Sequence, residues 1–81
     1  LQNMKYPVEA MNKKEQGKVI VQFIVSENGE VSEPKIIRSV SPALDKEACR
    51  IVLAMPKWTP GKLKGKPVAV RYMLPISFRL Q

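Results

Sequence analysis

The side chains that could carry out acid–base or nucleophilic chemistry are seven carboxylates and a single cysteine, Cys49, in a chain of 81 residues without histidine. Three of the carboxylates, Glu27, Glu30 and Glu33, flank a predicted turn, where we expect solvated groups rather than the facing pair that a glycosidase needs. The absence of histidine argues against zinc sites and against serine–histidine or cysteine–histidine catalysis. The four glycines form no phosphate-binding motif. We therefore predict no catalytic residue, no metal site and no cofactor, and we expect that the protein is not an enzyme.

The charge balance points to binding rather than chemistry. Fourteen Lys and Arg residues against seven Asp and Glu residues give a formal net charge of +7, which favours acidic partners or surfaces. The basic residues are scattered, so a solvated basic face is the simpler interpretation. No apolar run approaches the roughly 18 residues of a membrane span, and the chain opens at Leu1 without a secretory pattern or an initiator Met. We expect a fragment or a processed product of a longer protein.

The strongest structural signal is residues 66–80. Apolar side chains occupy every even position from Val68 to Leu80, and this period of two predicts a strand with one buried face. Pro75 excludes a continuous helix and belongs at a sheet edge, because a proline in a central strand would lose a ladder hydrogen bond. The sequence thus predicts a long edge strand whose unpaired backbone could receive a strand from another chain.

The elements that must position this strand can be placed by their own patterns. The side chains of residues 18–26 alternate between two largely apolar faces, which predicts a central strand that we expect to be covered on both sides. Asn28-Gly29 predicts a hairpin turn to a partner strand over residues 31–40. In that partner strand, Pro34 predicts an edge position or a bulge.

Two helices complete the predicted fold. Pro7 is expected at the first helical position of a short N-terminal helix whose apolar side is Val8, Ala10 and Met11. Ser41-Pro42 predicts the start of a longer helix that ends before Pro56 and carries an apolar stripe, namely Leu44, Ala48, Ile51, Val52 and Met55. Residues 62–66 are expected to be a basic connector, and Cys49 a small core or rim residue.

The predicted fold class is therefore α+β: a three-stranded antiparallel sheet in α-β-β-α-β order, with one long helix packed on a face and a short N-terminal helix. The last strand pairs with the first, which leaves the second and third strands at the edges. We expect one domain over residues 1–81, with residues 1–5 as an extended lead-in, and we expect loss of the last strand to unfold it.

Ordered motifs along almost the whole chain closely resemble the C-terminal domain of the TonB family. The motifs are Tyr6-Pro7, Gly17-x-Val19-x-Val21-x-Phe23-x-Val25, Asn28-Gly29-x-Val31, Ser39, Leu44-Asp45, Ala48, Trp58-x-Pro60-Gly61, Gly65-x-Pro67-Val68 and Pro75-Ile76-x-Phe78. The last two are similar to TonB-like proteins of the Bacteroidetes group.

The resemblance implies a periplasmic domain of an energy transducer that is anchored in the inner membrane. Such a transducer is driven by the ExbB–ExbD motor through its N-terminal part, and serves outer-membrane TonB-dependent transporters for iron complexes, vitamin B12 or glycans. The family pairs its last strand with the TonB box, a short segment of the transporter.

Carried over by position, the resemblance implies partner contacts at two places. Tyr6 and Pro7 match a motif that lies near the docked segment, although Tyr6 is equally well interpreted as a packing anchor. Asn3 stands where the family often has glutamine, so a side-chain contact from there is not expected to be kept. The pairing edge would comprise Ala69, Val70, Arg71, Tyr72, Met73 and Leu74, with Pro75 interrupting the ladder because it cannot donate.

Three alternatives remain open from the sequence. A basic nucleic-acid-binding module is disfavoured, because Phe23, Tyr72 and Phe78 fall on predicted core faces whereas stacking needs exposed aromatics; we expect no nucleic-acid partner. The same fold could be appended to a membrane sensor or metallopeptidase, or act as a TolA-like relay. A homodimer could form by pairing of the terminal edge, alongside the docking role.

Overall fold

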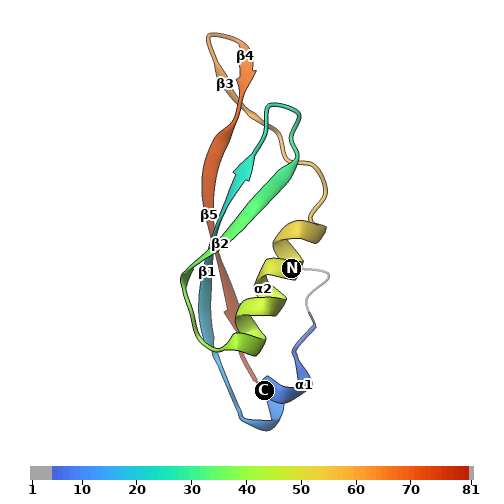
Figure 1. The fold of residues 1–81 in the computed structure, drawn as a ribbon, viewed down its shortest axis with the longest axis vertical. Helices are drawn as coiled ribbons and strands as arrows, with labels where there is room; N and C mark the ends of the chain where they lie inside the picture. The colour runs from blue at the N-terminus through green and yellow to red at the C-terminus, as the bar shows by residue number, and fades with distance from the viewer. Residues whose placement is uncertain (1–4, 81) are drawn as a thin grey trace.

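The computed structural model describes residues 5–80, and Figure 1 shows a sheet crossed on one side by a helix. The elements follow the order α1 (Val8–Asn12), β1 (Gly17–Val25), β2 (Val31–Arg38), α2 (Pro42–Ala54), β3 (Gly61–Leu63), β4 (Lys66–Val68) and β5 (Val70–Phe78). The sheet has the order β2-β1-β5 and is antiparallel throughout, while β3 and β4 form a separate hairpin. The predicted α+β class is confirmed, as are the central first strand and the two edge strands.

The core lies between the sheet and α2. One face of β1 is completely buried through Val19, Val21, Phe23 and Val25. The apolar stripe of α2 meets this face with Leu44, Ala48, Ile51 and Val52, and β5 adds Ile76 and Phe78. The even-numbered side chains of β5 are buried or half-buried and the odd-numbered ones are exposed, as the alternation predicts.

The bounds of α2 follow from local chemistry. The Ser41 hydroxyl accepts a hydrogen bond from the N–H of Leu44, at 3.2 Å, and Pro42 occupies the first turn. Met55 has ψ of 145°, outside the helical region, because Pro56 restricts the residue before it. Both predicted ends are confirmed. Among the described residues, no helix has the length and apolar character that crossing a bilayer requires.

Two expectations about packing are wrong. The second face of β1 is not covered: Ile20, Gln22 and Ile24 are only half-buried, because both helices pack on the other side of the sheet. In α1, the side chains of Val8 and Met11 remain 70% and 47% exposed, and only Ala10 enters the core. A helix of five residues turns one side to the core, so one small residue suffices there.

A third correction concerns Pro7 and the lead-in. Pro7 has ψ of 136° and precedes α1 as its N-cap residue, so it is not the first helical residue. Apart from Lys5, the predicted lead-in lies outside the described residues.

The basic connector and the terminal strand also differ from the prediction. Residues 62–66 belong to the β3–β4 hairpin, whose two-residue turn places Lys64 at φ 52° and Gly65 at φ 79°. Positive φ at both turn residues is what a tight hairpin of this kind requires. The predicted strand over residues 66–80 is consequently divided at Ala69, where the chain leaves the hairpin and joins the main sheet as β5.

Candidate partner-binding site

The candidate site is the outer edge of β5. This strand pairs with β1 at nine successive positions, from Val70 opposite Val25 to Phe78 opposite Gly17, without a register shift. Among the described residues, no strand pairs with its other side. A regular edge of this length is a template for another strand.

The opposite edge of the sheet is much less regular. The pairing of β2 with β1 shifts register twice, between Ile20 and Val21 and between Gln22 and Ile24. Glu33 in β2 has φ of 52°, and Pro34 follows it. Bulges and prolines are the features that blunt an edge against strand addition. Of the two edges, β5 is therefore the one suited to receive a strand.

The orientation of the backbone along β5 can be inferred from its proline. In an antiparallel ladder every second residue directs its N–H and C=O toward the neighbouring strand, and the alternate residues direct theirs away. Pro75 pairs with Ile20 of β1 and has no N–H, so it belongs at a position whose nitrogen faces away from β1. By this alternation Arg71, Met73 and Ser77 turn their backbone groups to the open edge, where Pro75 offers only its carbonyl.

The predicted pairing residues that lie on β5 therefore divide into two groups. Arg71 and Met73 have exposed side chains, with 63% of Met73 accessible, and their backbone faces the edge. Val70, Tyr72 and Leu74 direct side chains toward the helix and backbone groups toward β1, so they support the edge rather than form it. Ala69 lies in the break between β4 and β5.

Tyr6 and Pro7 are not brought together with the residues around Met73. The Tyr6 ring makes an edge-to-face contact with Phe78, with 5.8 Å between ring centroids, and its hydroxyl donates to the carbonyl of Glu15. Burial, and secondarily the charge of Glu15, raises the pKa of Tyr6. Phe78 lies about 17 Å along the strand from Met73, at roughly 3.4 Å per residue. Tyr6 is thus a packing anchor at the C-terminal end of β5.

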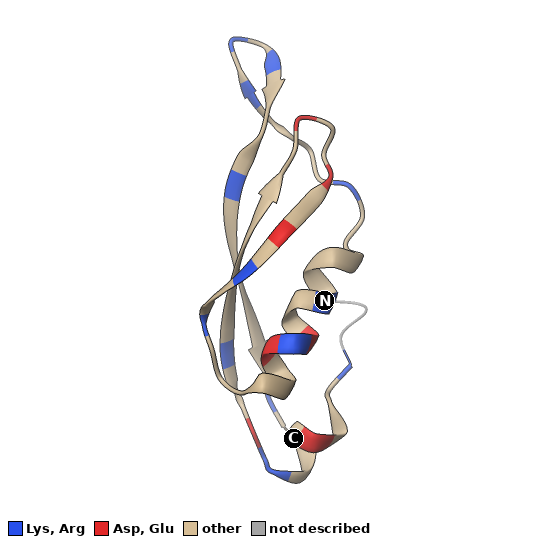
Figure 2. Cartoon of the chain, in the orientation of Figure 1, with Lys and Arg blue, Asp and Glu red and all other residues tan. Residues whose placement is uncertain are grey.

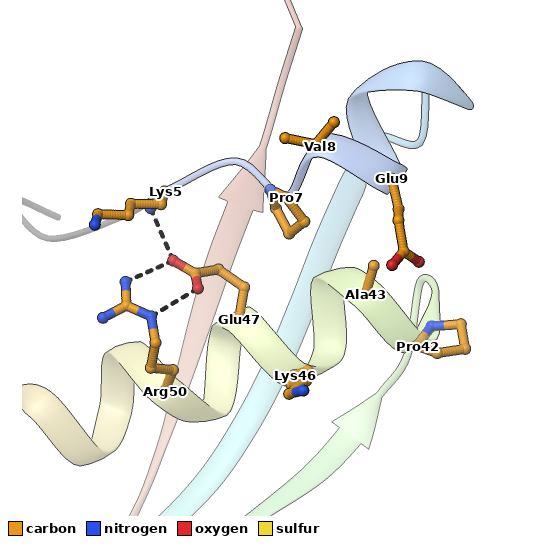
Figure 3. Close-up of a pocket in the computed structure, with 9 residues that line it drawn as sticks. All are labelled: Lys5, Pro7, Val8, Glu9, Pro42, Ala43, Lys46, Glu47 and Arg50. Carbon is orange, nitrogen blue, oxygen red and sulfur yellow. Dashed lines mark hydrogen bonds and ion pairs between the residues drawn. The ribbon is translucent and has the colours of Figure 1, made fainter.

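Pro7 lines a cleft of about 590 Å³ between the N-terminal segment and α2 (Figure 3). At one side of this cleft the Glu47 carboxylate, only 8% exposed, accepts hydrogen bonds from the backbone N–H of Lys5 at 2.8 Å and from Arg50 Nε and Nη2 at 2.7 Å each. The hydrogen bond from Arg50 and then that from Lys5 lower the pKa of Glu47 against its burial. The bond from Lys5 attaches the N-terminal segment to α2, and the bonds from Arg50 hold the Glu47 carboxylate in place on α2.

An aromatic cluster that the sequence did not predict supports the other end of β5. Trp58 packs on Phe23 and Tyr72 with ring centroids 5.2 and 5.3 Å away. Its backbone N–H donates to the carbonyl of Gly29 at 2.9 Å, which fixes it to the β1–β2 turn. A Cβ on Gly29 would lie 2.3 Å from the Trp58 carbonyl oxygen, so this approach requires glycine. The Asn-Gly and Trp-x-Pro-Gly motifs are the signals that could have indicated the contact.

The remaining reactive group is half-buried on α2. Burial, and secondarily the charge of Asp45, raises the pKa of the Cys49 thiol, which makes it a poor nucleophile. Within residues 5–80, no group of three or more His, Cys, Asp or Glu side chains could hold a metal ion. What the described surface offers is an unpaired backbone edge.

Comparison with known proteins agrees with this architecture. The family model of the Gram-negative bacterial TonB protein C-terminal region matches residues 2–80. The fold is similar to the NMR solution structure of the TonB C-terminal domain of Helicobacter pylori, with a TM-score of 0.73 and 21% sequence identity over 99% of this chain and 72% of that one. No curated protein matches the chain in sequence. The match over almost the whole chain shows that it belongs to the TonB C-terminal family.

Proposed function

We propose that the domain docks the TonB box of an outer-membrane TonB-dependent transporter as an added strand on the outer edge of β5. The observation that carries the proposal is the nine-position regular pairing of β5 on one side and its unpaired edge on the other. Backbone hydrogen bonds of an added strand contribute about 0.5–1.5 kcal/mol each. The open-edge groups of Arg71, Met73 and Ser77 supply them, with a gap at Pro75.

The side chains beside this edge define what a docked strand would contact. On the exposed face, Arg71 and Met73 lie next to alternate side chains of the added strand. On the helix-covered face, Tyr72 and Leu74 are half-buried and continue the core toward the edge. An apolar side chain of the docked strand on that face would extend the core. Tyr6, packed on Phe78, bounds the far end of the site.

We propose further that the domain transmits a pull from the ExbB–ExbD motor, which uses the proton-motive force, to the transporter. The N-terminal segment is attached to α2 through the hydrogen bond from Lys5 to Glu47, and leads to β1 at Gly17, opposite Phe78. A pull on that end of β1, opposed by a docked strand pulled toward the β3–β4 hairpin, acts along the strands. The hydrogen bonds between β1 and β5 then share the load instead of opening one by one.

This role is that of a binding module in the periplasm, within a protein anchored in the inner membrane, and it requires no catalysis. A homodimer that pairs two β5 edges would occupy the same site and compete with docking. The same domain attached to another membrane protein would keep the edge but have a different partner.

The test is an NMR titration of the ¹⁵N-labelled domain with synthetic TonB-box peptides from transporters of the same genome. We expect the largest amide shifts along β5, above all at Arg71, Met73 and Ser77, and small shifts along β2. The control is the same peptide with a central proline, which cannot complete the ladder. Shifts centred on β2 or on α2, or a folded monomer that binds no peptide, would contradict the proposal. A dimer that dissociates on dilution and then binds peptide would support it.

A further inference from the structure

The β3–β4 hairpin carries a feature that the docking role does not use. All seven acidic residues lie between positions 9 and 47, whereas the residues after position 47 carry only basic charges: Arg50, Lys57, Lys62, Lys64, Lys66, Arg71 and Arg79. Three of these lysines fall on the hairpin, and Figure 2 shows blue without red there. Among the described residues, no ion pair involves them.

The hairpin contributes little to the fold. Among the described elements, its substantial contacts are those between its own two strands. Leu63 stays 64% exposed, and at Gly65 a Cβ would find no atom within 4 Å. An isolated two-stranded hairpin gains little stability by itself. Packing therefore does not explain three lysines and an exposed leucine at this place.

The geometry makes the hairpin a projecting tip. The molecule measures 49 × 21 × 18 Å, and Figure 1 shows the hairpin at one extreme of the long axis with α1 at the other. The turn at Lys64 and Gly65 forms the tip itself. Leu63 lies opposite Lys66, so these two share a face, and Lys62 shares the other face with Pro67. A flat surface can meet this tip without touching the rest of the domain.

We propose that the β3–β4 hairpin attaches the domain to an anionic lipid surface, with Lys62, Lys64 and Lys66 at the headgroups and Leu63 inserted between them. Lysine ammonium groups on flexible stems suit a diffuse negative charge rather than a shaped pocket. An exposed leucine among lysines matches the boundary between headgroups and acyl chains. A single-stranded nucleic acid would instead need exposed aromatics, whereas Trp58 and Tyr72 are half-buried and pack against each other in a tilted arrangement.

The attachment is weak and additional to strand docking. Each lysine near an anionic surface contributes on the order of a fivefold change in binding, so the three together contribute roughly 100-fold. Insertion of Leu63, which is 64% exposed, adds about fivefold to 25-fold. The inference does not depend on the proposed docking function, because it concerns a different part of the chain and a different partner.

The test is co-sedimentation of the domain with vesicles at low salt. One set of vesicles contains phosphatidylcholine alone and the other equal parts of phosphatidylcholine and phosphatidylglycerol. The variant K62E/K64E/K66E is compared with K13E/K14E/K35E, which makes the same change in net charge at three exposed lysines elsewhere. Leu63→Ser is compared with Leu53→Ser, whose side chain is 56% exposed on α2.

We expect binding to the anionic vesicles only. The hairpin variant should lose at least roughly 100-fold in affinity, because it removes three lysines and adds three carboxylates, and its matched control about tenfold or less. Leu63→Ser should weaken binding and Leu53→Ser should not. Equal losses within either pair would overturn the proposal, as would equal binding to both kinds of vesicle. Binding to poly-glutamate without binding to anionic vesicles would also overturn it, and would indicate an acidic protein partner. Trp58 fluorescence reports whether each variant is folded.

Discussion

The alternation inferred along β5 predicts opposite effects for two substitutions at neighbouring edge positions. Met73→Pro removes an N–H that faces the open edge, and Pro75→Thr restores one that is missing there. Neither change is expected to break the ladder between β5 and β1, because both positions turn their backbone away from β1. Both side chains are exposed on the uncovered face of the sheet, so the core is also unaffected.

The size of the effect follows from single backbone hydrogen bonds. At about 0.5–1.5 kcal/mol each, one lost bond weakens binding of a TonB-box peptide roughly twofold to tenfold, and one gained bond strengthens it by the same factor. Met73→Pro should therefore raise the Kd and Pro75→Thr should lower it. Isothermal titration calorimetry with one peptide gives both values, and urea unfolding followed by Trp58 fluorescence checks that stability is kept.

Leu74→Pro is the control for the alternation itself. Leu74 pairs with Val21 and turns its backbone toward β1, so proline there leaves a partner carbonyl unsatisfied and should cost about 1–3 kcal/mol of stability. If Met73→Pro destabilised the domain as much as Leu74→Pro does, the alternation would be reversed. If Pro75→Thr left the Kd unchanged while the peptide still bound, the docked ladder would not reach position 75.

Two further predictions concern stability. Glu47→Gln should cost about 1–2 kcal/mol near neutral pH, because charge-assisted bonds are lost but Arg50 is half-exposed to solvent. Since the folded-state pKa of Glu47 lies below the ordinary value of 4.5, its contribution to stability is complete above that pH and is lost as the pH falls below it. Urea unfolding of both proteins across this range should show that their difference in free energy of unfolding shrinks at low pH. A constant difference would contradict this prediction. Gly29→Ala should cost about 3 kcal/mol or more of stability, because φ is 83° there and the Trp58 carbonyl oxygen blocks a Cβ. Gly65→Ala should cost only about 1–2 kcal/mol, because φ is similar at 79° but the space around it is open. Equal melting temperatures for these two alanine variants would show that the contact with Trp58 is not tight.

The sheet and its long helix could be predicted because each carries its own local signal. The alternation along β5 and the Ser41-Pro42 start of α2 depend only on neighbouring residues. Likewise Pro34 and Pro75 identify the two edge strands without any knowledge of the pairing, since a central strand excludes proline.

The uncovered face of the sheet could not be predicted from the same signals. Ile20 and Ile24 are as apolar as residues that are fully buried, and periodicity does not tell how many layers a sheet has. Coverage depends on how much helix is available. With α2 as the only long helix and α1 turning a single alanine inward, one face of the sheet remains open within the described residues.

Local signals likewise could not show that the residues assigned to the partner-binding site lie in separate places. A resemblance transfers residues by position, and so placed Tyr6 and Met73 in one set; the structure places Tyr6 against Phe78, at the end of β5 that adjoins the N-terminal segment. Met73 is five residues from Phe78 along β5, so roughly 17 Å of strand separates two groups that were assigned to one site. The position of each group along β5 is known only from the register of β5 with β1.

The hairpin explains why the terminal strand does not continue to residue 66. A β5 extended in that direction would run past Val25, the last residue of β1 that pairs with it, and would leave its backbone unpaired on both sides. Folding back through Lys64 and Gly65 gives residues 66–68 a partner in residues 61–63. The backbone there is satisfied by a local turn instead of the main sheet, so its side chains are free of core packing. Because β1, β5 and α2 form the core, the lysines and the leucine of the hairpin can contact a partner without changing the fold.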